Sequence, residues 1–222
     1  HASRPPEVVV ERAERVAEDI VMLTLASPDG KALPRWTPGA HIDVECGDTG
    51  MSRQYSLCSD PAETGRLQIA VLRETESRGG SAWVHAHAKP GVRLRIRGPR
   101  SHFRLDESTP RAIFIAGGIG ITPISAMARR ARDVGIDYEL HYSGRSRDGM
   151  ALLQQLQQLH GDRLRIYVTQ ESTRNDFATL LAQPGVGTQV YACGPERMLD
   201  ALKSACAHWP EDTLRVEHFH ST

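Results

Sequence analysis

The sequence predicts two domains of different fold class, an N-terminal antiparallel β-barrel followed by an α/β domain on a parallel sheet. From residue 8 to about residue 105 the apolar runs are short, β-branched and separated by Gly and Pro, which is typical of an antiparallel barrel or sandwich. From Pro110 onward, apolar runs alternate with helical stretches, which is typical of a parallel sheet with helices on both sides. We expect domains at residues 1–107 and 108–222.

The barrel strands are predicted from short apolar runs between turn-forming pairs such as Asp29-Gly30 and Pro90-Gly91. These runs are residues 8–10, 20–25, 42–44, 52–57, 67–72 and 92–96. One helix is expected to interrupt them, beginning near Ser81 and ending near Pro90.

The second half reads as a regular alternation of strand and helix. The strands are expected at residues 112–116, 138–142, 164–169, 189–192 and 213–219, and the helices at 123–134, 150–160, 177–182 and 195–207. The first strand is continuously apolar, as expected of a strand covered on both faces. Ligands of such sheets lie at the carboxyl ends of the strands, so we expect a ligand site at the turns that follow these strands.

Composition excludes several function classes. The 27 Lys and Arg balance the 27 Asp and Glu, which argues against a nucleic-acid partner and a polybasic membrane anchor. No apolar run approaches the roughly 20 residues that span a bilayer. We therefore expect a cytoplasmic protein, with a monomer as the simplest oligomeric state.

The cysteines and histidines show no metal pattern. The four cysteines are Cys46, Cys58, Cys193 and Cys206. They form neither a CxxC pair nor the plant-type iron–sulfur spacing, so we expect reduced thiols. We expect no metal site and no iron–sulfur cluster in this chain.

A glycine-rich turn follows the first strand of the second half. Gly117, Gly118 and Gly120 precede Thr122, a good N-cap, and Pro123, which suits the first helical position. The free amides of such a helix start favour a pyrophosphate. An ordinary tight turn is the alternative, and the segment is not the GxGxxG fingerprint of dinucleotide-binding dehydrogenases.

Two further strand ends carry candidate residues. Cys193-Gly194-Pro195 again joins a strand to a helix, and Cys193 there can lie beside a nicotinamide ring or be a buried packing thiol. Ser143 and Arg145 follow the second strand, where they can meet the adenosine ribose, and an arginine there can accept a 2′-phosphate. Solvated loop arginines are the alternative.

The first half contains its own polar cluster. Strand alternation puts Arg53 and Tyr55 on one face and Ser56 on the other. A guanidinium suits a phosphate, and a tyrosine suits ring or hydroxyl contacts. Downstream, Arg78-Gly79-Gly80-Ser81 forms a glycine-rich helix entry, with Ser81 as its cap and a second phosphate as its ligand.

These motifs together resemble the ferredoxin-NADP reductase superfamily. They occur in the order Arg53-x-Tyr55-Ser56-Leu57, Arg78-Gly79-Gly80-Ser81, Gly117-Gly118-x-Gly120-x-Thr122-Pro123 and Cys193-Gly194-Pro195. The form with Trp83 and His85 after the Gly-Gly-Ser is similar to the phthalate dioxygenase reductase family, which includes vanillate demethylase reductases. The resemblance covers essentially the whole chain.

The resemblance implies a flavin-binding barrel followed by an NAD-binding domain. It assigns Arg53, Tyr55, Ser56 and Leu57 to the flavin, with Ser56 near the reactive ring nitrogen, and the Arg78–Ser81 turn to the flavin phosphate. It puts Thr122 near the flavin–nicotinamide contact, and Phe219, within Glu217-x-Phe219, against the flavin ring. It assigns the second-half glycines, Pro123 and Cys193-Gly194-Pro195 to NAD. Ser56, Thr122 and Cys193 are the expected catalytic residues, and no general base is expected.

The implied function is a reductase that passes a hydride from NADH to FMN and then single electrons to an iron–sulfur partner. That partner is a ferredoxin domain or protein, serving a Rieske-type oxygenase. Relatives often continue into a [2Fe–2S] ferredoxin domain, which we expect to be lacking here because the chain stops at Thr222. The alternatives are FAD in place of FMN, NADPH in place of NADH, reduction of flavins, ferric ions or quinones, and a non-catalytic flavin- or nucleotide-binding module.

Overall fold

The computed structural model describes residues 6–75 and 79–219 of the 222. The chain divides into two compact units between Arg104 and Leu105, and we call them the barrel unit and the α/β unit. Arg78 lies outside the described residues. No helix among the described residues has both the length and the apolarity to cross a bilayer.

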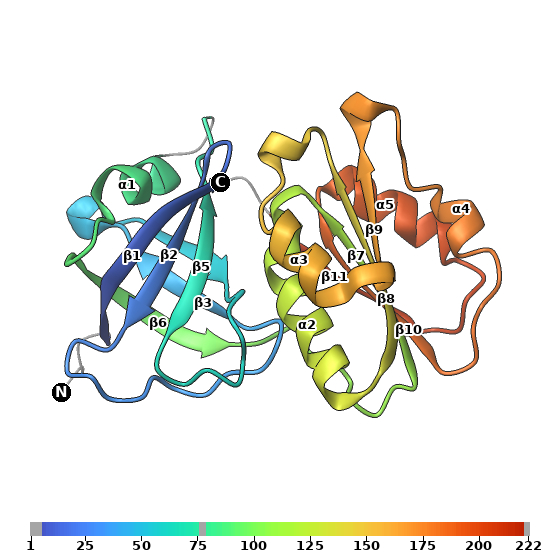
Figure 1. Ribbon diagram of the computed structural model, residues 1–222, viewed down its shortest axis with the longest axis horizontal. Coiled ribbons are helices and arrows are strands. Elements are labelled where there is room, and N and C mark those ends of the chain that lie inside the picture. Colours follow the sequence, from blue (N-terminus) through green and yellow to red (C-terminus); the bar gives the residue numbers. More distant parts are fainter. Residues whose placement is uncertain (1–5, 76–78, 220–222) are drawn as a thin grey trace. The chain divides into compact units, whose positions relative to one another are not determined.

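The barrel unit is one antiparallel sheet in the strand order β4-β3-β6-β1-β2-β5 (Figure 1). Its strands are β1 (Glu7–Ala17), β2 (Ile20–Ala26), β3 (His41–Glu45), β4 (Ser52–Ser56), β5 (Leu67–Leu72) and β6 (Arg93–Arg100). A bridge between Leu57 and Ile69 joins the two edge strands, and the Cys58 N–H donates to the Gln68 carbonyl oxygen at 3.0 Å. The predicted N-terminal antiparallel barrel is confirmed.

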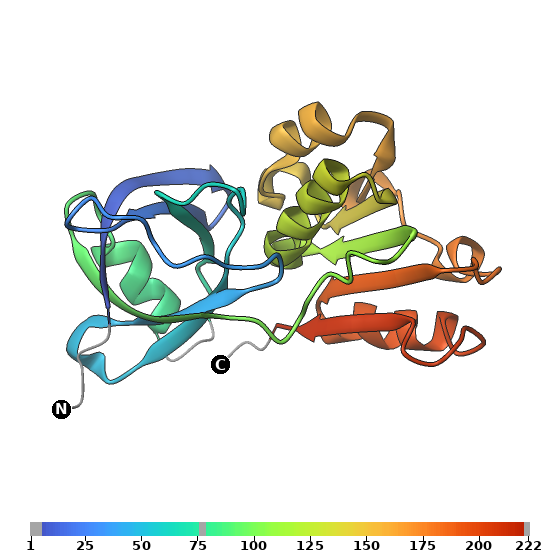
Figure 2. The same cartoon turned by 90° about the horizontal axis from the view of Figure 1, so that it is seen from below.

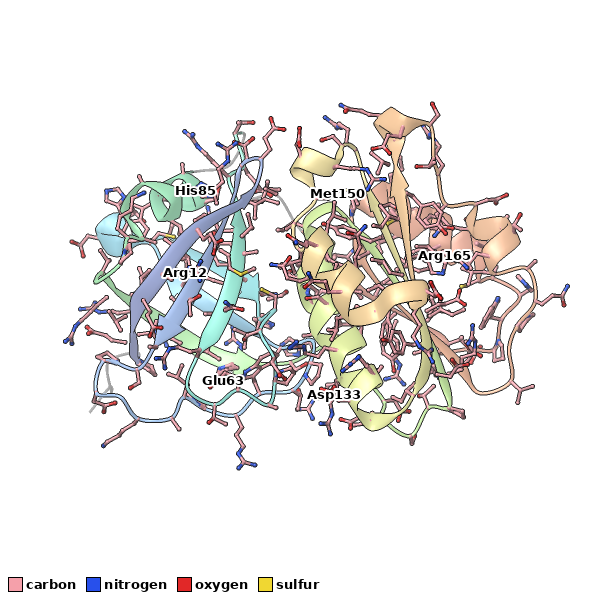
Figure 3. The ribbon with its side chains drawn as sticks, in the orientation of Figure 1. Arg12, Glu63, His85, Asp133, Met150 and Arg165 are labelled. Carbon is pink, nitrogen blue, oxygen red and sulfur yellow. The ribbon has the colours of Figure 1, made fainter. Side chains whose placement is uncertain are left out.

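Alternation along these strands builds the barrel core. Ile42 and Val44 of β3 are fully buried, while Asp43 between them is only partly so. Helix α1 (Gly80–His87) is tied to the sheet by His85 (Figure 3), whose Nε2 lies 2.7 Å from the Val71 carbonyl oxygen of β5. The helix that interrupts the barrel is therefore anchored to β5, an edge strand of the sheet.

The α/β unit is a five-stranded parallel sheet in the order β11-β10-β7-β8-β9. Its strands are β7 (Arg111–Gly117), β8 (Asp137–Gly144), β9 (Leu164–Val168), β10 (Thr188–Gly194) and β11 (Leu214–His218). Its helices are α2 (Ile121–Val134), α3 (Leu153–His160), α4 (Phe177–Leu180) and α5 (Glu196–Ala205). Figure 2 shows α2 and α3 on one side of the sheet and α5 on the other, so the predicted α/β fold is confirmed.

The strand order reverses between β7 and β10. The chain moves outward from β7 to β8 and β9, and then returns to β10 on the other side of β7. A parallel sheet binds its ligand where two neighbouring strands send their connections to opposite faces. The ends of β7 and β10 are therefore the expected ligand position in this unit.

One predicted helix begins later than expected. Residues 150–152 are not helical because Leu152 adopts a left-handed backbone conformation with φ 68°, so α3 begins at Leu153. Met150 (Figure 3) packs instead against Gly144 at the end of β8, where a Cβ would lie 2.6 Å from its Sδ. Close packing between the loop and the strand thus replaces the first helical turn.

Candidate functional site

The beginning of α1 meets the side chain of Arg53 from β4. Gly79 turns the chain into the helix with φ +99°, a conformation that favours glycine. A Cβ on Gly80 would lie 2.6 Å from Arg53 Nε and 2.7 Å from its Cγ. Glycine at position 80 therefore lets the guanidinium lie at the free amides of a helix start.

The guanidinium of Arg53 has unused hydrogen-bonding capacity. Its Nη1 donates to the Ser52 carbonyl oxygen at 3.0 Å, and its Nη2 lies 3.7 Å from Met51 Sδ. Among the described residues, no carboxylate lies within ion-pair distance of it. A cation beside a helix N-terminus has the donor set that a phosphate requires.

Tyr55 adds a polar atom that has no hydrogen-bond partner among the described residues. Its Oη is buried and makes no hydrogen bond within the described part of the chain. Burial raises the pKa of Tyr55 well above its usual value, and nearby Cys46 acts in the same direction, so the phenol stays protonated. Because an unsatisfied buried hydroxyl is unfavourable, this atom fits a site that is completed by a ligand.

Ser81 does not cap α1 as predicted. The N-cap is Gly79, and Ser81 is the second helical residue. Its Oγ accepts a hydrogen bond from the Glu74 N–H at 2.9 Å, so the hydroxyl ties the helix to the segment after β5. The left-handed Gly79 starts the helix early, which moves Ser81 past the capping position.

Ser56 is the last residue of β4, on the face that alternation predicts, and Leu57 follows the strand. Ser56 is opposite His41 in the β3–β4 pairing, whereas Tyr55 and Arg53 are opposite Ile42 and Val44 on the other face. Ser56 is buried, and the Leu57 side chain belongs to the barrel core.

Three residues that the sequence analysis did not assign lie in or next to the first turn of α1. The Sγ of Cys46 lies 3.7 Å from the Gly80 carbonyl oxygen. Burial raises the pKa of Glu74, and Arg53 opposes that rise. Trp83, whose ring would lie 2.6 Å from a Cβ on Gly47, stacks on His87 with ring centroids 4.9 Å apart. Only Trp83 had a sequence signal, because it belongs to the quoted Gly-Gly-Ser-x-Trp motif.

The α/β unit aligns the remaining predicted residues along the carboxyl edge of its sheet. The parallel register pairs Gly117 with Ser143 on one side of β7 and Ala116 with Cys193 on the other. Cys193 in turn pairs with Glu217 of β11, and Phe219 follows that strand half-buried. Arg145 and Pro195 are exposed just beyond their strands.

Close backbone packing joins the ends of β7 and β10. A Cβ on Gly120 would overlap the Cys193 carbonyl group and lie 2.9 Å from the Gly194 nitrogen. Met198 of α5, which we had not assigned, packs against Gly117 and Gly194, with its Sδ 2.7 Å and 3.2 Å from their respective Cβ positions. The glycines are therefore needed for close approach at the switch point.

Thr122 is not the N-cap of α2, and Pro123 is not its first residue. A 3-10 turn at Gly118–Gly120 leads into the helix, which begins at Ile121 with Gly120 as N-cap. Thr122 Oγ1 donates to the Ile119 carbonyl oxygen at 3.1 Å. Pro123 remains within the first turn, where a missing N–H has no intrahelical partner to lose.

Cys193 is fully buried beneath this turn. Burial raises the pKa of its thiol well above the usual value, and the nearby Glu217 carboxylate adds to the rise. The thiol is therefore protonated, and its complete burial is that of a packing thiol, the alternative that the sequence left open. In the part of the chain that the structure describes, no three His, Cys, Asp or Glu side chains are placed to hold a metal ion.

Two family models match the chain. Residues 7–105 match the oxidoreductase FAD-binding domain. Residues 92–212 match the N-terminal domain of the dimethylamine monooxygenase subunit DmmA-like family. Each match falls largely within one of the two units, so both halves are similar to oxidoreductase components.

Individual relatives extend these matches over nearly the whole chain. Phenoxybenzoate dioxygenase subunit beta of Ectopseudomonas oleovorans is 44% identical, over 91% of this chain and 63% of its own length. An intact type IV self-sufficient cytochrome P450 monooxygenase is 52% identical with a TM-score of 0.94, over 98% of this chain and 28% of its own. Phthalate dioxygenase reductase is 32% identical with a TM-score of 0.90, over 96% of this chain and 67% of its own.

A barrel followed by a parallel α/β unit, with these motifs in both, defines an oxidoreductase with a flavin-binding domain. More narrowly, the chain belongs to the ferredoxin-NADP reductase superfamily, in the group of oxygenase reductases that includes phthalate dioxygenase reductase. The 222 residues span at most about two thirds of the length of these relatives.

Proposed function

We propose that this chain is the FMN- and NADH-binding part of a reductase that supplies electrons to an oxygenase through an iron–sulfur partner. Residues 1–107 would bind the flavin and residues 108–222 the nucleotide. The observation that carries the proposal is the Arg53 guanidinium, without a carboxylate partner among the described residues, at the start of α1.

The barrel residues would hold the flavin by its phosphate and its ring. Arg53 and the amides of Gly80 and Ser81 would bind the phosphate, and Tyr55 would use its unpartnered Oη as a donor. A monophosphate suits one cation and one helix start, which supports FMN over FAD. A bound flavin supplies the chemistry, because it accepts two electrons as a hydride and releases them singly.

The α/β residues would orient the nicotinamide nucleotide. The amides after Gly117 would hold the pyrophosphate, and the Cys193-Gly194-Pro195 turn would line the nicotinamide site. Thr122 and Ser56 would provide hydrogen bonds near the reacting atoms. No side chain needs to act as a general base, because hydride transfer depends on orientation.

The electron acceptor is proposed from the relatives. Phthalate dioxygenase reductase is described as transferring electrons from pyridine nucleotides to a [2Fe–2S] centre. We propose a [2Fe–2S] domain or protein as the immediate acceptor and a Rieske-type oxygenase beyond it. The 52% identity with part of a cytochrome P450 monooxygenase favours a P450 as the second candidate for the terminal oxygenase.

Anaerobic titration of the flavin-loaded protein with NADH tests the proposal. We expect one equivalent of NADH to bleach one equivalent of flavin, and mass spectrometry of the flavin released by heat to identify FMN. Release of FAD would overturn the FMN assignment. Failure to bleach would favour a non-catalytic binding module.

A second assay separates the possible acceptors. We expect faster turnover with an isolated [2Fe–2S] ferredoxin than with free flavin, ferric chelates or quinones. The reverse order would favour a reductase of small acceptors. The cytoplasmic, monomeric state stays a prediction, which sedimentation and cell fractionation can check.

A further inference from the structure

Two loops at the carboxyl edge of the α/β sheet are joined by an ion pair. The 3-10 turn after β8, Arg147–Gly149, faces the 3-10 turn after β9, Thr169–Glu171. Arg147 Nε lies 2.8 Å from Glu171 Oε2, and Arg147 Nη2 lies 3.1 Å from Glu171 Oε1. The pair is bidentate, so Glu171 occupies the Nε–Nη2 edge of this guanidinium.

Backbone contacts fix both sides of this pair. The Gln170 N–H donates to the Arg145 carbonyl oxygen at 3.0 Å, which ties the loops together next to the ion pair. Thr173 Oγ1 accepts from the Val168 N–H at 2.7 Å and lies 3.1 Å from the Val168 carbonyl oxygen. Glu171 is therefore presented to Arg147 by an ordered turn.

The position of these loops relates them to the nucleotide. In a doubly wound sheet the adenosine ribose lies at the end of the strand that neighbours the first one, where an arginine accepts the 2′-phosphate of NADPH. Here that strand is β8, whose Ser143 pairs with Gly117. The loop after β8 contains two arginines. Arg145 is exposed and has no ion pair among the described residues, whereas Arg147 is paired with Glu171.

We propose that Glu171 is a specificity-determining residue that lowers the affinity of this site for 2′-phosphorylated nucleotides. It holds Arg147 in a bidentate ion pair, which withdraws the better-aligned edge of the guanidinium from the nucleotide. A 2′-phosphate must displace Glu171 to bind the Nε–Nη2 edge of Arg147, whereas the 2′-hydroxyl of NADH makes no such demand. The inference rests on the proposed nucleotide site and deepens it.

Equilibrium binding of nucleotide fragments tests this role without any electron transfer. Isothermal titration calorimetry on the full chain would measure 5′-AMP and 2′,5′-ADP for the wild type and for Glu171→Gln. We expect the affinity for 2′,5′-ADP relative to 5′-AMP to rise about fivefold or more in the variant. The double variant Glu171→Gln with Arg147→Gln should lose that gain, because the freed guanidinium produces it.

Glu107→Gln is the matched control. Glu107 Oε1 accepts from Arg130 Nε at 3.1 Å and Nη2 at 2.9 Å, in a pair about as exposed as that of Glu171 but located before β7. Three outcomes would overturn the role of Glu171. The affinity for 2′,5′-ADP relative to 5′-AMP could rise equally in this control, it could rise in the double variant that lacks Arg147, or it could stay unchanged in Glu171→Gln. If the wild type bound neither fragment, the proposed nucleotide site itself would fail, and the Glu171 role with it.

Discussion

At the scale of single residues, the barrel site is defined by groups whose hydrogen-bonding capacity is unused. Arg53 has spare donors, and Tyr55 keeps a buried hydroxyl without a partner among the described residues. Other buried tyrosines are satisfied: Tyr142 Oη donates to the Ala151 carbonyl oxygen at 3.0 Å. The contrast between the two tyrosines is a signature of a ligand site, because a folded protein rarely leaves a buried polar atom unpaired.

Tyr55→Phe tests that contrast. We expect the flavin-free protein to be as stable as the wild type or more stable by up to about 1 kcal/mol, since the variant removes an unsatisfied hydroxyl. Flavin affinity should fall by about fivefold, since a ligand hydrogen bond is lost. Urea unfolding and flavin fluorescence titration measure the two effects.

Tyr142→Phe is the control, and it should destabilise the protein by about 1 kcal/mol because it leaves the Ala151 carbonyl oxygen without its donor. Equal destabilisation of both variants would show that the Tyr55 hydroxyl has a structural partner.

Arg53→Gln tests the phosphate assignment. We expect flavin affinity to fall by about 10- to 100-fold, the effect of losing a charge-assisted hydrogen bond, while the flavin-free protein keeps its stability. Arg66→Gln, which breaks the exposed pair between Arg66 and Glu11 in the same unit, should leave flavin affinity unchanged. Fluorescence titration with FMN measures the flavin affinity of both variants. An Arg53→Gln variant with wild-type flavin affinity would refute the phosphate assignment.

At the scale of elements, the nucleotide site depends on how closely β7, β10 and α5 approach one another. Gly117, Gly120 and Gly194 each leave space that a neighbouring backbone or Met198 fills. Because the two strands are parallel and in register, a disturbance at one strand end moves the other.

Gly120→Ala should therefore be poorly tolerated. The added methyl group overlaps the Cys193 carbonyl group, and overpacking of this kind costs about 1–3 kcal/mol. We expect lower stability in urea and weaker binding of 5′-AMP. Gly149→Ala, where the nearest atom to the new Cβ lies 3.5 Å away, is the control and should behave as the wild type. Wild-type stability in Gly120→Ala would contradict the close packing.

At the scale of the whole molecule, each unit has its own core, and the core of the α/β unit contains a pH-sensitive histidine. In the α/β unit, His160 is buried with its Nδ1 2.7 Å from Tyr138 Oη, and its Nε2 has no partner among the described residues. Burial lowers the pKa of His160 to about 4, helped by Arg132, Arg129 and Arg163. The folded state therefore resists protonation of a group that the unfolded chain protonates near pH 6.5.

The sign of the effect follows from linkage. Above pH 6.5 His160 is neutral in both states, and as the pH falls toward 4 only the unfolded chain gains the proton, so stability is lost. The loss approaches about 3 kcal/mol at pH 4. His160→Asn should lose less over this range. Trp209 is the only one of the three tryptophans in this unit, so its fluorescence follows the unfolding. Parallel pH curves for the two proteins would rule out this role.

Local patterns account for much of what the sequence predicted. The change from short β-branched runs to strand–helix alternation predicted both fold classes. Glycine turns marked the beginning of α1 and the ends of β7 and β10. The failures were also local. The caps at Ser81 and Thr122 moved because Gly79 and a 3-10 turn start their helices earlier than side-chain capping rules imply.

The sequence by itself determined the two fold classes, their order along the chain and the positions of the glycine-rich turns, because alternation and turn chemistry act between near neighbours. Only the tertiary structure decided which distant residues meet. Arg53 lies against Gly80, Gly120 against Cys193, and Arg147 pairs with Glu171. The physical reason is that strand order and register, which bring these residues together, arise from packing of the whole sheet and leave no trace in local spacing.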